Sequence, residues 1–175
     1  MKPQAAFSSR SQVALDPTDW KIVSALQHNA RTSFAELGRH VGLSTPAAAE
    51  RVRKLEDSGV ILGYRAEIDP VRIGLPILAF VRLSVVGDVF TRITALVKDM
   101  PEVLECHRGT GADSFMMKVA VANVGHLETL IDRLTPFGTT TTSIVLSTPV
   151  TRRHLKAFHP HPKSAPMRKT ARVRS

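Results

Sequence analysis

The chain has 175 residues, of which 43% are hydrophobic and 22% charged, so it holds enough apolar material for one ordinary domain or two small ones and is not disordered throughout. No apolar run approaches the roughly 20 residues of a membrane-spanning helix, and residues 1–12 lack the apolar stretch of a secretory signal, so we expect a soluble cytoplasmic protein with no membrane partner. The single cysteine, Cys106, excludes an internal disulfide and a thiolate-rich metal cluster.

Most of the net charge of +9 lies at one end of the chain. Residues 151–175 contain eight Lys and Arg side chains and no acid, whereas the first 150 residues contain 16 basic and 15 acidic groups. The charge of the body therefore does not by itself indicate a nucleic-acid binder. We divide the chain into a flexible leader (1–14), a patterned body and a basic, disordered tail (151–175).

The body divides once, where two prolines and a glycine interrupt any regular structure. This predicts a linker over 69–76 between a domain at 15–68 and a second domain at 77–150.

Three helices in the first domain are predicted from signals at their ends. The first has Asp16 as its N-cap and Pro17 at the first helical position, where the missing N–H has no cost. The second begins at Ser33, which can form a capping box with Glu36, and ends at Gly42. A third helix follows almost at once, and two short helices joined by a tight glycine-containing turn are typical of a helix-turn-helix.

The third helix has a buried stripe of Ala48, Val52 and Leu55, and Ser44 or Thr45 is its N-cap. Small residues at its start allow close approach to base edges, and long cations further along reach bases or phosphates. Charges on an isolated helix also fit a solvated face, but the three-helix context favours insertion into the major groove of double-stranded DNA. The predicted DNA-binding residues are Ser44, Thr45, Pro46, Ala47, Arg51 and Lys54. The segment Val60–Ile68 is interpreted as a short extended wing.

The second domain alternates strand and helix patterns in the order βαββαβ, which predicts an α+β, ferredoxin-like fold with two helices on one face of an antiparallel sheet. The other face of the sheet would then be exposed to solvent. A second copy of the chain is the simplest way to bury it, so we expect a homodimer. The predicted strands are 77–86, 103–108, 115–122 and 139–150, and the helices cover 90–100 and 124–134.

Residues 15–150 resemble the Lrp/AsnC family (leucine-responsive, feast/famine regulators) of bacterial and archaeal transcription regulators, which join a winged helix-turn-helix to a ferredoxin-like sensing domain. The resemblance rests on the helical segment, on the loop in RGTGADSFMMKV and on the closing strand TTTTSIVLSTPV. It implies a non-enzymatic regulator whose dimers assemble to tetramers or octamers and respond to an amino acid or related metabolite. Two recognition helices related by a two-fold axis favour an imperfect palindrome in the DNA.

The resemblance also implies an effector site at the loop before the third strand. Asp113 is suited to accept a ligand ammonium, while N–H groups at Thr110 and Gly111 and the hydroxyl of Thr141 are suited to its carboxylate. Many members space this loop as Gly-x-x-Asp, whereas here the spacing is one residue shorter and an ungapped alignment places Ser114 at the aspartate position. The same residues also fit an ordinary turn.

Competing chemistry is limited to a few residues. Cys106 and His107 are neighbours on a strand and therefore point to opposite faces, so we interpret the cysteine as buried and structural, not as a nucleophile. Some haem-biosynthesis decarboxylases share a similar two-domain architecture, and His107 with Arg108 is compatible with tetrapyrrole binding as the alternative. His154, His159 and His161 lack the companions of a metal site, and we expect no metal and no cofactor.

Two interpretations of the basic tail remain open. Its cations can displace counterions from DNA phosphates and add attraction that does not depend on sequence. It can equally serve only to keep the protein soluble.

Overall fold

A computed structural model of the chain describes residues 12–157, so most of the predicted leader and the tail from residue 158 lie outside the described residues. The described chain forms two compact units. The helical unit consists of residues 12–65 together with 152–157, and the sheet unit consists of residues 66–151. No helix among the described residues is long and apolar enough to cross a membrane.

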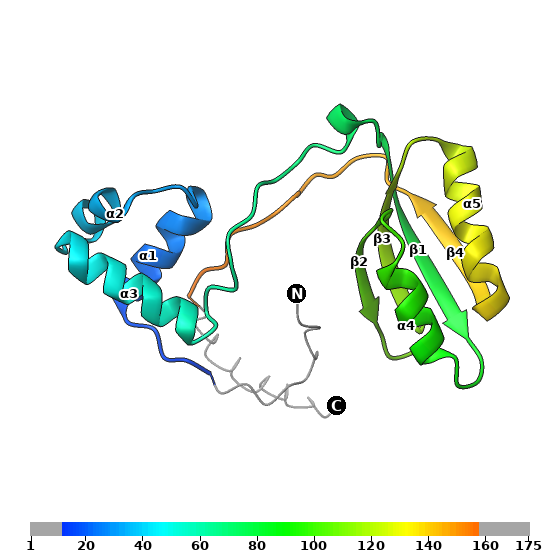
Figure 1. The fold of residues 1–175 in the computed structure, drawn as a ribbon, viewed down its shortest axis with the longest axis horizontal. Coiled ribbons are helices and arrows are strands. Elements are labelled where there is room, and N and C mark those ends of the chain that lie inside the picture. Colours follow the sequence, from blue (N-terminus) through cyan, green and yellow to red (C-terminus); the bar gives the residue numbers. More distant parts are fainter. Residues whose placement is uncertain (1–11, 158–175) are drawn as a thin grey trace, which may run out of the picture. The chain divides into compact units, whose positions relative to one another are not determined.

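The helical unit contains α1 (Pro17–His28), α2 (Phe34–Val41) and α3 (Thr45–Asp57) (Figure 1). Each helix begins at a polar N-cap, and Ser44 rather than Thr45 caps α3, its hydroxyl accepting from the Ala47 N–H. The predicted capping box of α2 is present, and Asp16 and Asp19 form a second one at α1. Because these bonds satisfy N–H groups that have no partner inside the helix, they fix where each helix starts.

The turn between α2 and α3 depends on close packing at Gly38. The Leu43 N–H donates to the Gly38 carbonyl at 2.8 Å, and a Cβ atom placed on Gly38 would lie 2.6 Å from the Leu43 carbonyl oxygen. Gly42 ends α2 in the left-handed conformation, with φ of 77°. Both positions therefore favour glycine, one for space and one for backbone conformation. The buried core below this turn consists of Ile22, Leu37, Val52 and Leu55.

The segment predicted as a wing contains no strand. Val60 and Ile61 pack on the helical core, residues 62–69 have no regular structure, and a short 3-10 helix follows at Val71–Ile73. The Tyr64 hydroxyl donates to Glu56 Oε1 at 2.8 Å, which ties the start of this segment back to the end of α3. The segment interpreted as an extended wing thus has no neighbouring strand to pair with among the described residues.

The sheet unit contains β1 (Ile77–Val85), α4 (Phe90–Lys98), β2 (Val103–Arg108), β3 (Phe115–Val121), α5 (Val124–Leu134) and β4 (Gly138–Ile144). The strands form one antiparallel sheet in the order β2-β3-β1-β4. The α+β architecture predicted from the sequence is confirmed, with β4 ending six residues earlier than expected.

The two faces of this sheet differ in cover. Alternate residues of β1 and β3, among them Val81 and Met117, are fully buried in one core with Ile93 of α4 and Leu130 of α5. Figure 1 shows both helices beside the sheet. On the opposite face Phe80 and Met116 are 48% and 42% exposed. We call this second surface the open face; it also carries Leu78, Arg82, Ser84, Lys118, His107, Thr139, Thr141 and Ser143.

Candidate nucleic-acid interface and effector loop

The N-terminal turn of α3 is exposed and made of small residues. Ser44, Thr45 and Pro46 are exposed, and Ala47 is partly buried beside them. Within this turn Pro46 has no N–H and the Ala47 N–H is bound by the cap, which leaves the Thr45 N–H at the positive end of the helix dipole. Such a surface can approach base edges or phosphates closely.

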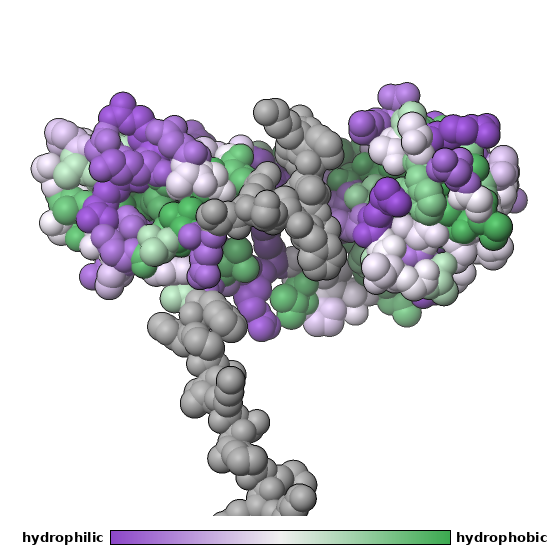
Figure 2. Space-filling view, turned by 90° about the horizontal axis from the view of Figure 1, so that it is seen from below, coloured by the Kyte–Doolittle hydropathy of each residue, from purple (hydrophilic) through white to green (hydrophobic). Residues whose placement is uncertain are grey.

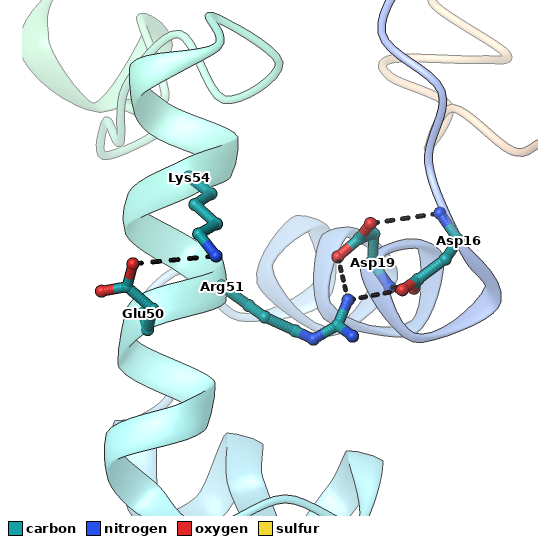
Figure 3. A network of polar contacts seen from close by, with 5 residues as sticks. All are labelled: Asp16, Asp19, Glu50, Arg51 and Lys54. Atoms are coloured by element: carbon teal, nitrogen blue, oxygen red, sulfur yellow. Dashed lines mark hydrogen bonds and ion pairs between the residues drawn. The ribbon is translucent and has the colours of Figure 1, made fainter.

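Arg51 faces α1 instead of projecting away from the domain (Figure 3). Its Nη1 donates to Asp16 Oδ2 at 2.6 Å and to Asp19 Oδ1 at 2.7 Å, and only 35% of the side chain is exposed. These bonds raise the pKa of Arg51, while the Asp19 N–H and then Arg51 lower the pKa of Asp16. Arg51, one of the predicted DNA-binding residues, therefore lies on the flank of α3 next to the buried stripe and joins α3 to the cap of α1.

The outermost cations of α3 are Arg53 and Lys54, whose side chains are 68% and 73% exposed. Glu50 forms ion pairs with both, at 3.9 Å from its Oε1 to Lys54 Nζ, and the Arg53 hydrogen bond lowers the pKa of Glu50. Figure 3 shows Lys54 and Glu50 on a different side of α3 from Arg51. Arg53 was missed in the sequence, although counting seven residues on from Pro46 places it on the same face, opposite the buried stripe.

Two of the predicted effector residues, Asp113 and Thr141, lie next to an arginine that the sequence did not single out. Arg82 Nη1 lies 3.6 Å from Asp113 Oδ2, and Arg82 is the register partner of Thr141 on β4. The Ser84 hydroxyl is 3.3 Å from Asp113 Oδ1 and donates to the Ala112 carbonyl at 2.7 Å. The Arg82–Asp113 pair is long for an ion pair and partly exposed, so its charges remain open to a ligand.

The rest of the loop is attached to β1 by its backbone. The Ser114 N–H donates to the Leu83 carbonyl at 3.0 Å, and the Ser114 hydroxyl accepts from the Val85 N–H at 3.4 Å. Ser114 therefore anchors the loop, and the carboxylate at this site is that of Asp113. Thr110 and Gly111 lie at the exposed tip, where Gly111 has φ of 104°.

The structure does not bring together the residues of the alternative functions, a cysteine nucleophile and a tetrapyrrole site. Cys106 pairs with Met117 in the register and His107 with Met116, so the two point to opposite faces as predicted. Cys106 is exposed, which corrects the expectation of a buried cysteine, and desolvation raises the pKa of its thiol. Arg108 lies over the Phe90 ring at 4.3 Å, on the helix-covered face, while His107 is on the open face.

Comparisons with known proteins agree with this arrangement. Residues 15–56 match the AsnC-type helix-turn-helix domain and residues 78–155 match the Lrp/AsnC ligand binding domain. The chain is 44% identical over 133 residues to the HTH-type transcriptional regulator YezC of Bacillus subtilis, covering 76% of this chain and 94% of that protein. It is 33% identical over 133 residues to LrpC of the same organism, covering 76% of this chain and 92% of that protein.

Solved structures give the same result. The structure of B. subtilis LrpC matches with a TM-score of 0.76 and 32% identity, covering 80% of this chain and all of that one. A transcriptional regulator of Neisseria meningitidis in complex with L-Met matches with a TM-score of 0.76 and 28% identity, covering 81% of this chain and 96% of that one.

Proposed function

Because the chain belongs to the Lrp/AsnC family of transcriptional regulators, we propose that it binds a specific DNA sequence and that a small amino acid or related metabolite controls this binding and the assembly of the protein. The relatives compared above carry the names of transcriptional regulators and not of enzymes. The observation that carries the proposal is the exposed, small-residue N-terminal turn of α3 with Arg53 and Lys54 projecting further along the helix. We propose that the protein acts in the cytoplasm, where the DNA is.

At the DNA, Ser44, Thr45, Pro46 and Ala47 approach the base edges of the major groove. Arg53 and Lys54 leave Glu50 to contact bases or phosphates, since a phosphate or guanine is a stronger partner than an exposed carboxylate. Arg51 acts indirectly: its bonds to Asp16 and Asp19 hold α3 at a fixed angle to α1.

Dimerisation covers the apolar part of the open face, around Phe80 and Met116. Phe80 and Met116 are large apolar side chains that remain about half exposed there, while the helix-covered face is already packed. Pairing two such faces would bury them and relate two α3 helices by a two-fold axis. This supports an imperfect palindrome with half-sites about one helical turn, roughly 34 to 36 Å, apart, and further assembly to tetramers or octamers.

The effector is a zwitterion held by opposite charges. Asp113 accepts the ammonium of an amino acid and Arg82 binds its carboxylate, so that the ligand inserts between two groups now 3.6 Å apart. Thr141, beside Arg82 in the register, and the N–H groups of Thr110 and Gly111 add hydrogen bonds. A ligand with different affinity for two assembly states shifts the equilibrium between them and so alters DNA binding.

Sequencing the DNA that co-purifies with the protein from cells tests this function. We expect enriched fragments with an inverted repeat, and retardation of such a duplex should change when one or a few amino acids are added. Equal binding of all duplexes would contradict sequence-specific recognition, and identical binding with every amino acid would contradict control by such a ligand.

A further inference from the structure

The chain returns to the helical unit after the last strand of the sheet unit. Residues 152–157, which we call the strap, belong to the helical unit, whereas the sequence indicated a separate tail from residue 151. The side-chain amide of Gln27 holds the strap by both backbone groups of one residue: Gln27 Nε2 donates to the Leu155 carbonyl at 2.9 Å, and Gln27 Oε1 accepts from the Leu155 N–H at 2.8 Å.

This attachment is specific in two respects. One amide group satisfies the donor and the acceptor of the same residue, as a neighbouring strand would, which sets both the position and the direction of the strap. The next residues of each segment also meet, because the rings of His28 and His154 pack edge to face with centroids 4.8 Å apart. The strap is thus seated on the last turn of α1.

The helical unit has little positive charge without the strap. Residues 12–65 contain seven basic and six acidic side chains, a net charge of +1. Arg51 is bound by two aspartates, and Arg53 and Lys54 both face Glu50. Figure 2 shows hydrophilic residues mixed with hydrophobic ones over the visible face of each unit. A DNA-binding domain needs cations that can neutralise phosphates, and these helices supply few that lack an acidic neighbour.

The strap changes this balance. It contributes Arg152, Arg153 and Lys156 and no acid, which raises the net charge of the described helical unit to +4. Arg153 and Lys156 are exposed. His28, which packs against His154 of the strap, lines one surface hollow together with Glu36 and His40 of α2. In a helix-turn-helix, the helix before the recognition helix crosses the DNA backbone. The cations are therefore held close to the part of the domain that meets phosphates.

We propose that the strap is a second DNA-contacting element, held on α1 by Gln27 so that Arg153 and Lys156 bind phosphates beside the site bound by α3. The strap adds affinity without sequence preference, because phosphate contacts carry no sequence information. The proposal rests on the DNA binding of the family, which a retardation assay of the wild-type chain checks independently.

Salt-dependent DNA titrations of the full chain test the phosphate contacts. Each lost contact reduces the magnitude of the negative slope of log affinity against log salt by about 0.9, so Arg153→Ala with Lys156→Ala should reduce that magnitude by about 1.8. Operator and unrelated DNA should lose affinity by the same factor. The matched control, Arg72→Ala with Lys98→Ala, removes the same charge from exposed positions of the sheet unit and should leave the slope unchanged. An unchanged slope in the first variant, or an equal fall in the control, overturns the proposal.

Gln27→Ala tests the anchor, because it keeps every charge. Its salt slope should be intermediate between those of the wild type and of the doubly substituted strap. The Leu155 amide should also exchange its hydrogen faster than in the wild type. Added to the doubly substituted strap, Gln27→Ala should cause no further loss. Ser24→Ala, at an exposed position of α1 outside the contact, is the control. Wild-type slope and wild-type exchange in Gln27→Ala overturn the anchoring role.

Discussion

The turn between α2 and α3 and the loop between β2 and β3 both contain glycine next to polar residues, yet their surroundings differ. A Cβ atom at Gly38 would lie 2.6 Å from the Leu43 backbone, whereas nothing lies within 4 Å of one at Gly111. Arg51, in the helix that follows the first turn, is bound at 2.6 and 2.7 Å by two aspartates, while Arg82 beside the second lies 3.6 Å from one. The first region therefore sets a fixed geometry, and the second keeps charges that a ligand can separate.

The largest expected effect is that of Gly38→Ala. Alanine normally stabilises a helix interior by about 1 kcal/mol relative to glycine, but the clash with the Leu43 carbonyl should reverse the sign and cost about 1 to 3 kcal/mol. Gly125→Ala is the matched control, since its nearest contact within 4 Å is the Asn123 side chain at 3.4 Å. Chemical denaturation measures both. If Gly38→Ala is as stable as Gly125→Ala, the turn is not tightly packed.

The next prediction distinguishes the roles of the two arginines of α3, Arg53 and Arg51. Arg53→Ala should weaken operator binding by about 1 to 3 kcal/mol if Arg53 contacts a base edge, with no change in the melting temperature. Arg51→Ala should lower the melting temperature, because two aspartates at α1 lose their partner. Fluorescence anisotropy with a labelled operator and thermal denaturation give the two readouts. A loss of DNA affinity at unchanged melting temperature in Arg51→Ala would return Arg51 to the DNA contacts.

Ligand binding to the loop should show in thermal shift measurements with the twenty amino acids. A ligand at 100 times its dissociation constant stabilises a protein by about 2.7 kcal/mol, and Asp113→Asn should abolish this for the amino acid that stabilises the wild type. Arg82→Gln should do the same. Thr129→Ala, on the exposed side of α5, is the control. If the amino acid stabilises Asp113→Asn and wild type equally, the loop is an ordinary turn.

The smallest expected effect is a difference in the salt dependence of DNA binding between two truncated chains. Removing the chain after Val150 deletes the strap and all eight cations of the predicted tail, and removing it after Ala157 leaves the strap. We expect the first truncation to flatten the salt dependence of DNA binding more than the second, with the preferred site unchanged. If both truncations flatten the salt slope equally, the effect belongs to residues beyond 157. If neither truncation changes the slope of the full chain, the tail has only a solubilising role.

The elements of the fold were predictable because their signals are local. Asp16, Ser33 and Gly42 act within one helical turn, so the ends of the helices follow from a few neighbouring residues. The end of β4 depends instead on its neighbour. Ile144 pairs with Ala79 and β1 begins at Ile77, so the β-branched residues after Val145 have no partner strand there.

The candidate site was predictable only where its residues are neighbours in the sequence. The small residues at the start of α3 are contiguous, but the partners of Arg51 are 32 and 35 residues away in the sequence. Arg82 meets Asp113 across the sheet, and Gln27 meets Leu155 at a separation of 128 residues. No periodicity reports such pairs, because they depend on tertiary packing.

The position of the strap also has a consequence for synthesis. The helices of the helical unit are complete once Arg65 has left the ribosome, but Arg152 follows only after the entire sheet unit has been made. At 5 to 20 residues per second this interval of about 90 residues lasts on the order of ten seconds. A chain released before the strap has been made therefore carries the three helices without Arg153 and Lys156.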